Sequence, residues 1–268
     1  MSDILNAVLL GIVEGLTEFL PVSSTAHLLL AEEFLGFAPP GDVFTIVIQF
    51  GAILSVVVVY WQKFWRATVD LPRDPKARRF AAGIIIAFLP AAIFGAALHG
   101  FIKRVLFSPS VAPFVIATTL LLGGILILIL ERIAPEPRHR DGDDLPLMKC
   151  FQIGLCQCLA LVPGVSRSGA TILGAELLGV ERKAAAAFTF YLAVPTMLGA
   201  TVFDLYKSWA LLDWTAGRDI AIGFVVSFIV AYGVVVTFIA FIGRYGLKPF
   251  GWYRILAGLG IFAALALG

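Results

Sequence analysis

The sequence predicts an all-α polytopic membrane protein, with six transmembrane helices and two re-entrant helical hairpins in inverted-topology repeats. The first observation is composition: 60% of the 268 residues are hydrophobic and 14% are charged, whereas a soluble domain carries about 25% charged residues. The second is a series of long apolar stretches. The third is a pair of similar apolar segments, each interrupted near its middle. We expect a single integral membrane domain over residues 1–268.

Six stretches are apolar and close to the ~20 residues that a spanning helix needs. They lie at 43–60, 80–102, 105–130, 184–203, 220–243 and 250–268. Their few charged residues fall near the edges, where the chain would meet water. The formal net charge of +2 argues against nucleic acid as a partner, and the lipid bilayer is the expected surrounding.

Two further apolar segments, 4–36 and 150–179, contain proline, glycine, hydroxyl and charged residues near their middle. We interpret each as two short helices joined by a turn, which is a candidate re-entrant hairpin. Irregular backbone at membrane depth is tolerated only where protein buries it or a water-filled cavity meets it. The two hairpins therefore indicate a polar cavity within the membrane.

The two broken segments also align with each other without a gap at an offset of 143 residues, with Ser23 on Ser166 among eight identities. Each half of the chain, repeat 1 at about 1–131 and repeat 2 at about 145–268, then holds one hairpin and three spans. Because three is odd, the second half is expected to be inverted relative to the first. Inverted repeats bring their broken helices together near the membrane midplane, where a site forms.

Basic residues set the expected orientation. They gather in the segments 63–79 and 132–149, which share one side of the membrane if the six spans alternate and the hairpins do not cross. The positive-inside rule makes that side cytoplasmic. The loops at 99–108 and 204–218 would then face outward, although Lys103 and Arg104 run against this.

Glu14 and Glu18 form the most informative pattern in the chain. They stand four residues apart in an apolar stretch, so a helix would place both carboxylates on one face. Buried carboxylates are costly unless a cation, a proton or a basic partner meets them. Together with a phosphate they suggest Mg²⁺ or Ca²⁺, which take oxygen ligands. We expect Glu14 and Glu18 to bind this divalent metal ion, and the repeat alignment places Gln157 opposite Glu14.

Hydroxyl groups and a histidine follow these carboxylates after a proline. Ser24 is a candidate nucleophile because His27, three residues later, would share its helical face and could act as a base. The alternative for Ser23 and Thr25 is helix capping. A lone histidine in an apolar stretch is also more often a core residue than a catalytic one.

The second hairpin carries an anion-binding pattern at 163–171, Pro-Gly-Val-Ser-Arg-Ser-Gly-Ala-Thr. A glycine-rich turn that opens a helix exposes backbone N–H groups to an anion, and Arg167 offers a planar fork suited to phosphate. The alternative is a buried ion pair of Arg167 with Glu14 or Glu18. The expected phosphate-binding residues are Gly164, Ser166, Arg167, Ser168, Gly169 and Thr171.

These two regions resemble the signature regions of the undecaprenyl-diphosphate phosphatase family of the bacitracin-resistance type. The first is E-x-x-x-E-x-x-P-V-S-S-T-A-H at 14–27, the second is the pattern at 163–171, and the likeness covers the full length. It implies hydrolysis of undecaprenyl diphosphate to undecaprenyl phosphate and inorganic phosphate, which recycles the lipid carrier of cell-wall synthesis. It also implies the bacterial cytoplasmic (inner) membrane, with the active site toward the periplasm. The residues that it implies to be functional are Glu14, Glu18, Ser24, His27, Ser166, Arg167 and Thr171.

The expected catalytic residues are Glu18, Ser24, His27 and Arg167. Ser24 would attack the terminal phosphate while His27 or Glu18 takes its proton, and a water nucleophile fits the sequence equally well. The main rival function is a lipid-phosphate flippase or transporter that uses the same anion site without a nucleophile. A non-catalytic scaffold is a third interpretation. The sequence leaves open whether a second copy of the chain is a partner in a homodimer.

Overall fold

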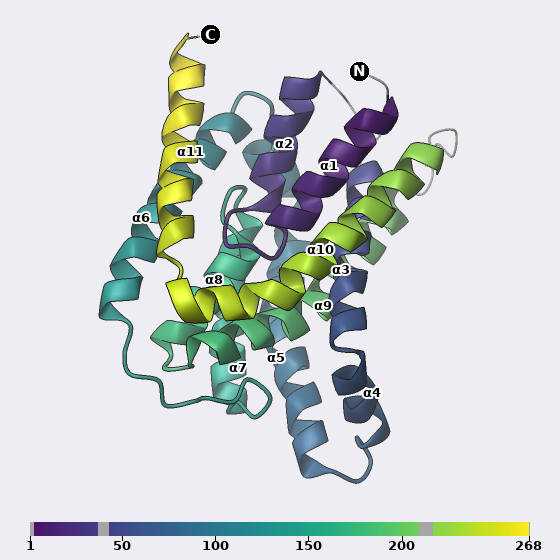
Figure 1. Cartoon of the computed structure of the whole chain (residues 1–268), viewed down its shortest axis with the longest axis vertical. Helices are drawn as coiled ribbons and strands as arrows, with labels where there is room; N and C mark the ends of the chain where they lie inside the picture. Colours follow the sequence, from purple (N-terminus) through teal and green to yellow (C-terminus); the bar gives the residue numbers. More distant parts are fainter. Residues whose placement is uncertain (1–2, 37–42, 209–216, 268) are drawn as a thin grey trace.

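The computed structural model describes residues 3–36, 43–208 and 217–267, and in this part of the chain the fold is all-helical, as predicted. Figure 1 shows the arrangement of the helices. In chain order they are α1 (Asp3–Thr17), α2 (Ser24–Leu35), α3 (Val43–Val59), α4 (Trp61–Val69), α5 (Pro75–Phe101), the π-helical η1 (Ile102–Leu106), α6 (Ala112–Ile133), α7 (Leu147–Gln157), the 3₁₀-helical η2 (Cys158–Leu161), α8 (Arg167–Leu177), α9 (Arg182–Ser208), α10 (Gly217–Tyr245) and α11 (Lys248–Leu267).

Five of the described helical segments are long and apolar enough to cross a membrane: α5 with its continuation η1, α6, α9, α10 and α11. A sixth span results if α3 and α4 are counted together across the 70° bend between them. The chain is therefore a multi-pass membrane protein. Its surface agrees, because many large apolar side chains are exposed along these helices, among them Ile93, Leu122 and Ile229.

Two connections differ from the sequence interpretation. The segment 63–79 is not simply a loop, because most of α4 lies in it, and Trp61 and Trp65 of that helix are stacked and exposed. The span expected at 105–130 begins later, at Ala112, since residues 102–106 continue α5 as a π-helix. Helix α4 is amphipathic and η1 contains Lys103 and Arg104, so neither is a uniformly apolar stretch.

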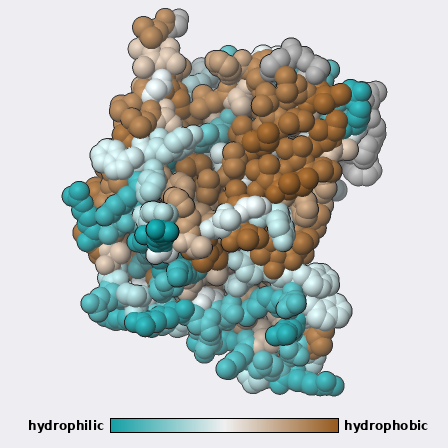
Figure 2. Space-filling model, viewed as in Figure 1, coloured by the Kyte–Doolittle hydropathy of each residue, from teal (hydrophilic) through white to brown (hydrophobic). Residues whose placement is uncertain are grey.

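The two basic segments lie at one end of the molecule. Two ion pairs join them, one between Lys63 and Asp143 and one between Arg79 and Asp144. Figure 2 shows hydrophilic residues gathered at this lower end, below a broad hydrophobic face over α1 and α10. The charge distribution is thus asymmetric along the long axis.

The two helical hairpins, α1–α2 and α7–η2–α8, enter the molecule from opposite ends, and their turns approach each other near the middle (Figure 1). Their second helices begin alike. Ser23 accepts a hydrogen bond from Ala26 N and caps α2, and Ser166 accepts one from Gly169 N and caps α8. Such caps satisfy N–H groups that a helix leaves unpaired at its start. The capping alternative for Ser23 is therefore confirmed.

Candidate active site

The turns of the two hairpins are bonded directly to each other. Ser168 Oγ donates to the Leu20 carbonyl at 2.8 Å, and Ser166 Oγ lies 3.3 Å from the same oxygen. The two hydroxyls are 2.9 Å apart. Residues more than 140 positions apart thus form one polar junction in the interior, as the sequence predicted for two broken helices.

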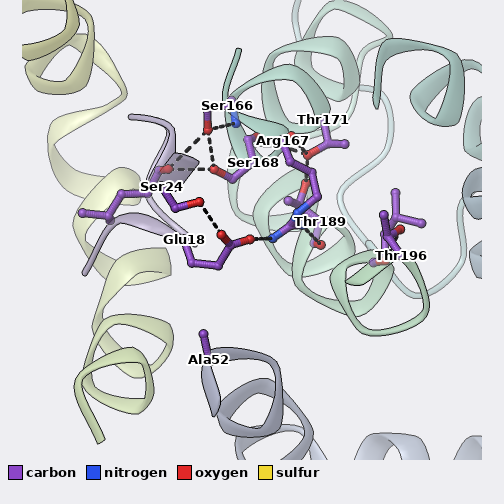
Figure 3. A network of polar contacts seen from close by, with 12 residues as sticks. Glu18, Ser24, Ala52, Ser166, Arg167, Ser168, Thr171, Thr189 and Thr196 are labelled. Atoms are coloured by element: carbon purple, nitrogen blue, oxygen red, sulfur yellow. Dashed lines mark hydrogen bonds and ion pairs between the residues drawn. The ribbon is translucent and has the colours of Figure 1, made fainter. Parts of the chain in front are cut away.

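Glu18 stands at the centre of this junction, between Ser24 and Arg167 (Figure 3). Ser24 Oγ donates to Glu18 Oε2 at 2.5 Å, and Arg167 Nη2 donates to Glu18 Oε1 at 3.1 Å. Glu18 and Ser24 are each only 8% exposed. Burial weakens solvent screening, so these charged contacts are stronger than the same contacts would be in water. The ion-pair alternative for Arg167 is therefore present, with Glu18 as its partner.

Arg167 retains donors beyond this ion pair. Its Nε is buried without a hydrogen-bond partner among the described residues, and its Nη1 makes only a long contact of 3.5 Å to the Thr189 carbonyl. Its guanidinium carbon lies 6.0 Å from the centre of the Phe19 ring. A buried guanidinium with an unsatisfied N–H is costly, so the arrangement favours an anionic ligand beside Arg167.

A cavity of about 510 Å³ opens onto these groups. Glu18, Ser24, Ser166 and Arg167 line its inner end, and its walls are mostly apolar side chains of α5 and α9. It extends to residues at and beyond the end of α5, in the segment expected to face outward: His99, Ile102 and Phe107. A larger hollow of about 820 Å³ lies at the opposite, charged end under α4, away from the hairpin turns. We place the site in the smaller cavity because only that one meets the junction.

The predicted phosphate-binding set divides into two groups. Ser166 and Arg167 line the cavity. The other four do not: Gly164, Ser168, Gly169 and Thr171 lie behind its wall. Ser166 Oγ accepts a hydrogen bond from the Gly169 N–H group, and the Thr171 hydroxyl accepts one from the Thr189 hydroxyl at 3.0 Å. The Gly169 N–H group and the Thr171 hydroxyl are thus bonded within the protein, and the phosphate-binding set stays a prediction.

Neither Glu14 nor His27 lines the cavity. Glu14 is fully buried, and neither of its carboxylate oxygens has a hydrogen-bond partner in the described part of the chain. His27 does not line the cavity or contact Ser24. Its Nδ1 lies 2.7 Å from the Ser23 carbonyl and its Nε2 lies 2.6 Å from the Tyr253 hydroxyl. The sequence proposed His27 or Glu18 as the base for Ser24, and it is Glu18 that lies beside the Ser24 hydroxyl.

Sequence reasoning missed Arg254, which is only 3% exposed in α11. Its Nη1 donates to the Pro21 carbonyl at 3.1 Å, and its Nη2 donates to the Gly164 and Thr119 carbonyls at 3.0 and 2.9 Å. One guanidinium thus bridges both hairpin turns and α6. The available indication was a charged residue inside an apolar span, which is costly and rarely without a role.

Gln157 was named from the sequence as the residue aligned with Glu14 but was not predicted to be a site residue. It is 2% exposed and lines the cavity, its Oε1 accepts from Thr196 at 3.3 Å, and its Nε2 has no partner among the described residues. The alignment that placed it opposite a candidate metal ligand could have marked it as a residue of the site.

Comparison with known proteins gives a consistent answer over the whole chain. The family described as bacitracin resistance protein BacA matches residues 7–260. The chain is 50% identical over 268 residues to undecaprenyl-diphosphatase 1 of Agrobacterium fabrum, covering 100% of this chain and 99% of that protein. It is 51% identical to an undecaprenyl-diphosphatase of Cereibacter sphaeroides, with 100% and 98% covered, and 48% identical to one of Paracoccus denitrificans, with 98% and 97% covered. The chain therefore belongs to the BacA family.

Proposed function

We propose that this protein hydrolyses undecaprenyl diphosphate to undecaprenyl phosphate and inorganic phosphate, and so recycles the lipid carrier of cell-wall synthesis. The observation that carries the proposal is the Glu18 carboxylate, which bonds a hydroxyl on one side and an arginine on the other at the end of a mostly apolar cavity. The names of its relatives describe the same reaction. A flippase or transporter has no need of a hydroxyl bonded to a carboxylate, so this pair favours hydrolysis.

In the proposed reaction, Arg167 turns part of its guanidinium from Glu18 to the terminal phosphate and stabilises the charge on its oxygens. Glu18 is then free to accept the proton of Ser24 as Oγ attacks the terminal phosphorus. The bond from phosphorus to the bridging oxygen breaks, and the proton passes to the departing monophosphate. Glu18 next accepts a proton from the water that hydrolyses the phosphoserine ester, and returns it to Ser24. Direct attack by water, activated by Glu18, is the alternative.

A divalent ion, Mg²⁺ or Ca²⁺, fits the donor chemistry beside this pair. The two unpartnered oxygens of Glu14 are a buried oxygen donor set, of the kind that hard cations select. The described residues contain no group of three or more His, Cys, Asp or Glu side chains that could hold a metal on its own, so phosphate or water oxygens would complete the shell. Glu14 and Glu18 would hold the ion, which would supply neutralisation of the diphosphate charge.

We further propose the inverted-repeat arrangement, with six spans, two re-entrant hairpins and repeats at about 1–131 and 145–268. Helix packing supports it. Gly11 of α1 lies against α10, where an added Cβ would meet the Gly223 carbonyl at 2.7 Å. A Cβ added at the aligned Gly154 of α7 would meet the Ala87 carbonyl of α5 even closer, at 2.3 Å. Helix α5 holds the place in repeat 1 that α10 holds in repeat 2, so the two contacts are equivalent under the repeat.

The cavity would open to the periplasm of a bacterial inner membrane. Its lining extends to His99 on α5 and to Phe107 beyond η1, whereas the basic segments are bonded together near the start of α5. If the basic end is cytoplasmic, the mouth is outside. The apolar walls would receive the start of the isoprenoid chain. A homodimer remains a prediction, to be checked by mass measurement in detergent.

The test is phosphate release by the purified protein. In detergent with undecaprenyl diphosphate and a divalent ion, the wild type is expected to release one inorganic phosphate for each substrate molecule consumed. Transfer of the lipid between leaflets of liposomes, without phosphate release at any divalent concentration, would instead establish a carrier.

A further inference from the structure

The contacts of His27 carry an inference that deepens the proposed function and rests on it. His27 lies on the first turn of α2. Its neighbours Ser24 and Thr25 line the cavity, whereas His27 does not. Its ring stacks on Tyr253 of α11, with ring centroids 5.5 Å apart and ring planes 14° from parallel. Both ring nitrogens lie within hydrogen-bonding distance of a partner, at 2.7 and 2.6 Å.

Hydrogen-bond chemistry fixes how these partners are used. A backbone carbonyl can only accept, so Nδ1 of His27 carries a proton toward the Ser23 oxygen. In a neutral imidazole Nε2 then has only a lone pair, which accepts the Tyr253 O–H proton. In a doubly protonated imidazole Nε2 donates to the same oxygen. In either state neither nitrogen is available to take a proton from Ser24.

The carbonyl that His27 holds belongs to an unusual residue. Ser23 has φ +72°, a backbone region that L-residues other than Asn, Asp and Gly rarely adopt. Such strain persists only where surrounding contacts hold it. Ser23 directly precedes Ser24, so its conformation sets the direction from which the Ser24 hydroxyl meets Glu18.

We infer that Tyr253 is a positioning residue of the proposed phosphatase: it orients His27, whose Nδ1–H holds the strained Ser23 carbonyl and thereby aims Ser24 at Glu18. His27 is on this account also a positioning residue rather than the general base. Tyr253 is 45% exposed, which allows its hydroxyl to be removed with little effect on packing.

The decisive comparison is between two His27 variants. In His27→Asn the amide nitrogen stands near the place of Nδ1 and can still donate to the Ser23 carbonyl, but the side chain cannot titrate. His27→Ala loses both properties. We expect kcat to fall about 10- to 100-fold in His27→Ala, the range that a misdirected nucleophile costs, and His27→Asn to recover most of that loss. The acid limb of the kcat–pH profile should persist in His27→Asn.

Tyr253→Phe is the second arm, with Tyr232→Phe as its control because Tyr232 is equally exposed, at 44%. Tyr253→Phe is expected to lower kcat several-fold with little change in KM, and to have no further effect in the His27→Asn background, where its acceptor is gone. Tyr232→Phe should match the wild type.

Two results would overturn the inference. One is a His27→Asn protein as inactive as His27→Ala, which would return the role of base to His27. The other is a Tyr253→Phe protein with unchanged kcat. A wild-type protein that releases no phosphate would refute the proposed function itself, so the two failures are distinguishable.

Discussion

At the scale of single residues, the proposed chemistry depends on Glu18, Ser24 and Arg167, and the contacts among them limit what each can do. Glu18 has both oxygens engaged, by Ser24 and by Arg167. Arg167 keeps an N–H without a partner. Before substrate binds, the ion pair keeps the buried carboxylate compensated. A phosphate that draws Arg167 away would leave Glu18 bonded only to the Ser24 hydroxyl. Substrate binding itself would then prepare Ser24 for attack.

Arg167 provides the first prediction. Arg167→Ala should reduce phosphate release about 10²- to 10⁴-fold, because a phosphate left uncompensated in a buried site loses on the order of 3–5 kcal/mol. Arg167→Lys should recover little, since a lysine cannot present a planar fork to two oxygens. Initial rates at saturating substrate measure the effect, with the exposed Arg244→Ala as the control. An Arg167→Ala protein that folds and retains the wild-type rate would contradict the assignment.

Ser24 and Glu18 are predicted to act as one unit. If so, Ser24→Ala, Glu18→Gln and the double variant should lose similar amounts of single-turnover rate, because residues that act together have non-additive effects. Rapid acid quenching of the wild type should trap phosphate on Ser24. Multiplicative losses would show that the two act independently. Fast turnover in Ser24→Ala would assign the attack to water.

Glu14 should affect metal dependence instead. An amide offers one neutral oxygen in place of a carboxylate, so Glu14→Gln should raise the Mg²⁺ or Ca²⁺ concentration that gives half-maximal activity. The measurement is a divalent titration, with Glu33→Gln, in the last turn of α2, as the control. An unchanged titration would mean that Glu14 has a different role.

The sequence predicted which residues gather but not which of them touch. Spacing placed Ser24 and His27 on one helical face, and α2 does begin at Ser24. The positive φ of Ser23 turns the chain so that Ser24 meets Glu18, which follows the last residue of α1, and no helical-wheel argument contains that information. Arg254 was missed for a related reason. Its partners are backbone carbonyls, which every residue has and which leave no pattern in a sequence.

At the scale of elements, the hairpins were predictable because the same kinds of residue interrupt an apolar stretch in both halves of the chain. Proline, glycine and hydroxyl residues in an apolar segment indicate a turn, and the structure has one in each. The amphipathic helix α4 and the π-helical end of α5 were not predictable in this way. Helix α4 carries polar residues along one side, and η1 contains Lys103 and Arg104, so neither forms the uniformly apolar stretch that predicts a span.

The turn of the second hairpin depends on Gly164, which has φ +83°. An added Cβ would also approach the Ile116 Cα and carbonyl of α6 at 3.0 and 3.1 Å. We expect Gly164→Ala to lower thermal stability in detergent and to reduce phosphate release, since the strained φ alone costs about 1–2 kcal/mol. Gly36→Ala is the control, because it shares the positive φ but has open space around the added carbon. Equal stability losses in both variants would show that the contact with α6 does not matter.

At the scale of the whole molecule, topology links the site to a side of the membrane. The ion pairs between 63–79 and 132–149 put both basic segments at one end, and the cavity extends to residues at and beyond the other end of α5. The outward loop expected at 204–218 falls largely outside the described residues, so the loop at 107–111 serves as the marker for the opposite side.

Single cysteines in a cysteine-free protein can test this arrangement in intact cells. Pro72→Cys and Glu136→Cys lie at exposed positions in the two basic segments, and Ser110→Cys lies at an exposed position after η1. None of the three changes alters the number of basic residues, so the positive-inside bias is preserved. A membrane-impermeant maleimide should label Ser110→Cys in whole cells, and should label the other two only after the membrane is opened. If positions 72 and 136 were labelled from opposite sides, the alternation of spans would be wrong. If both were labelled from outside, the cavity would open to the cytoplasm, and the enzyme would meet its substrate on the inner leaflet.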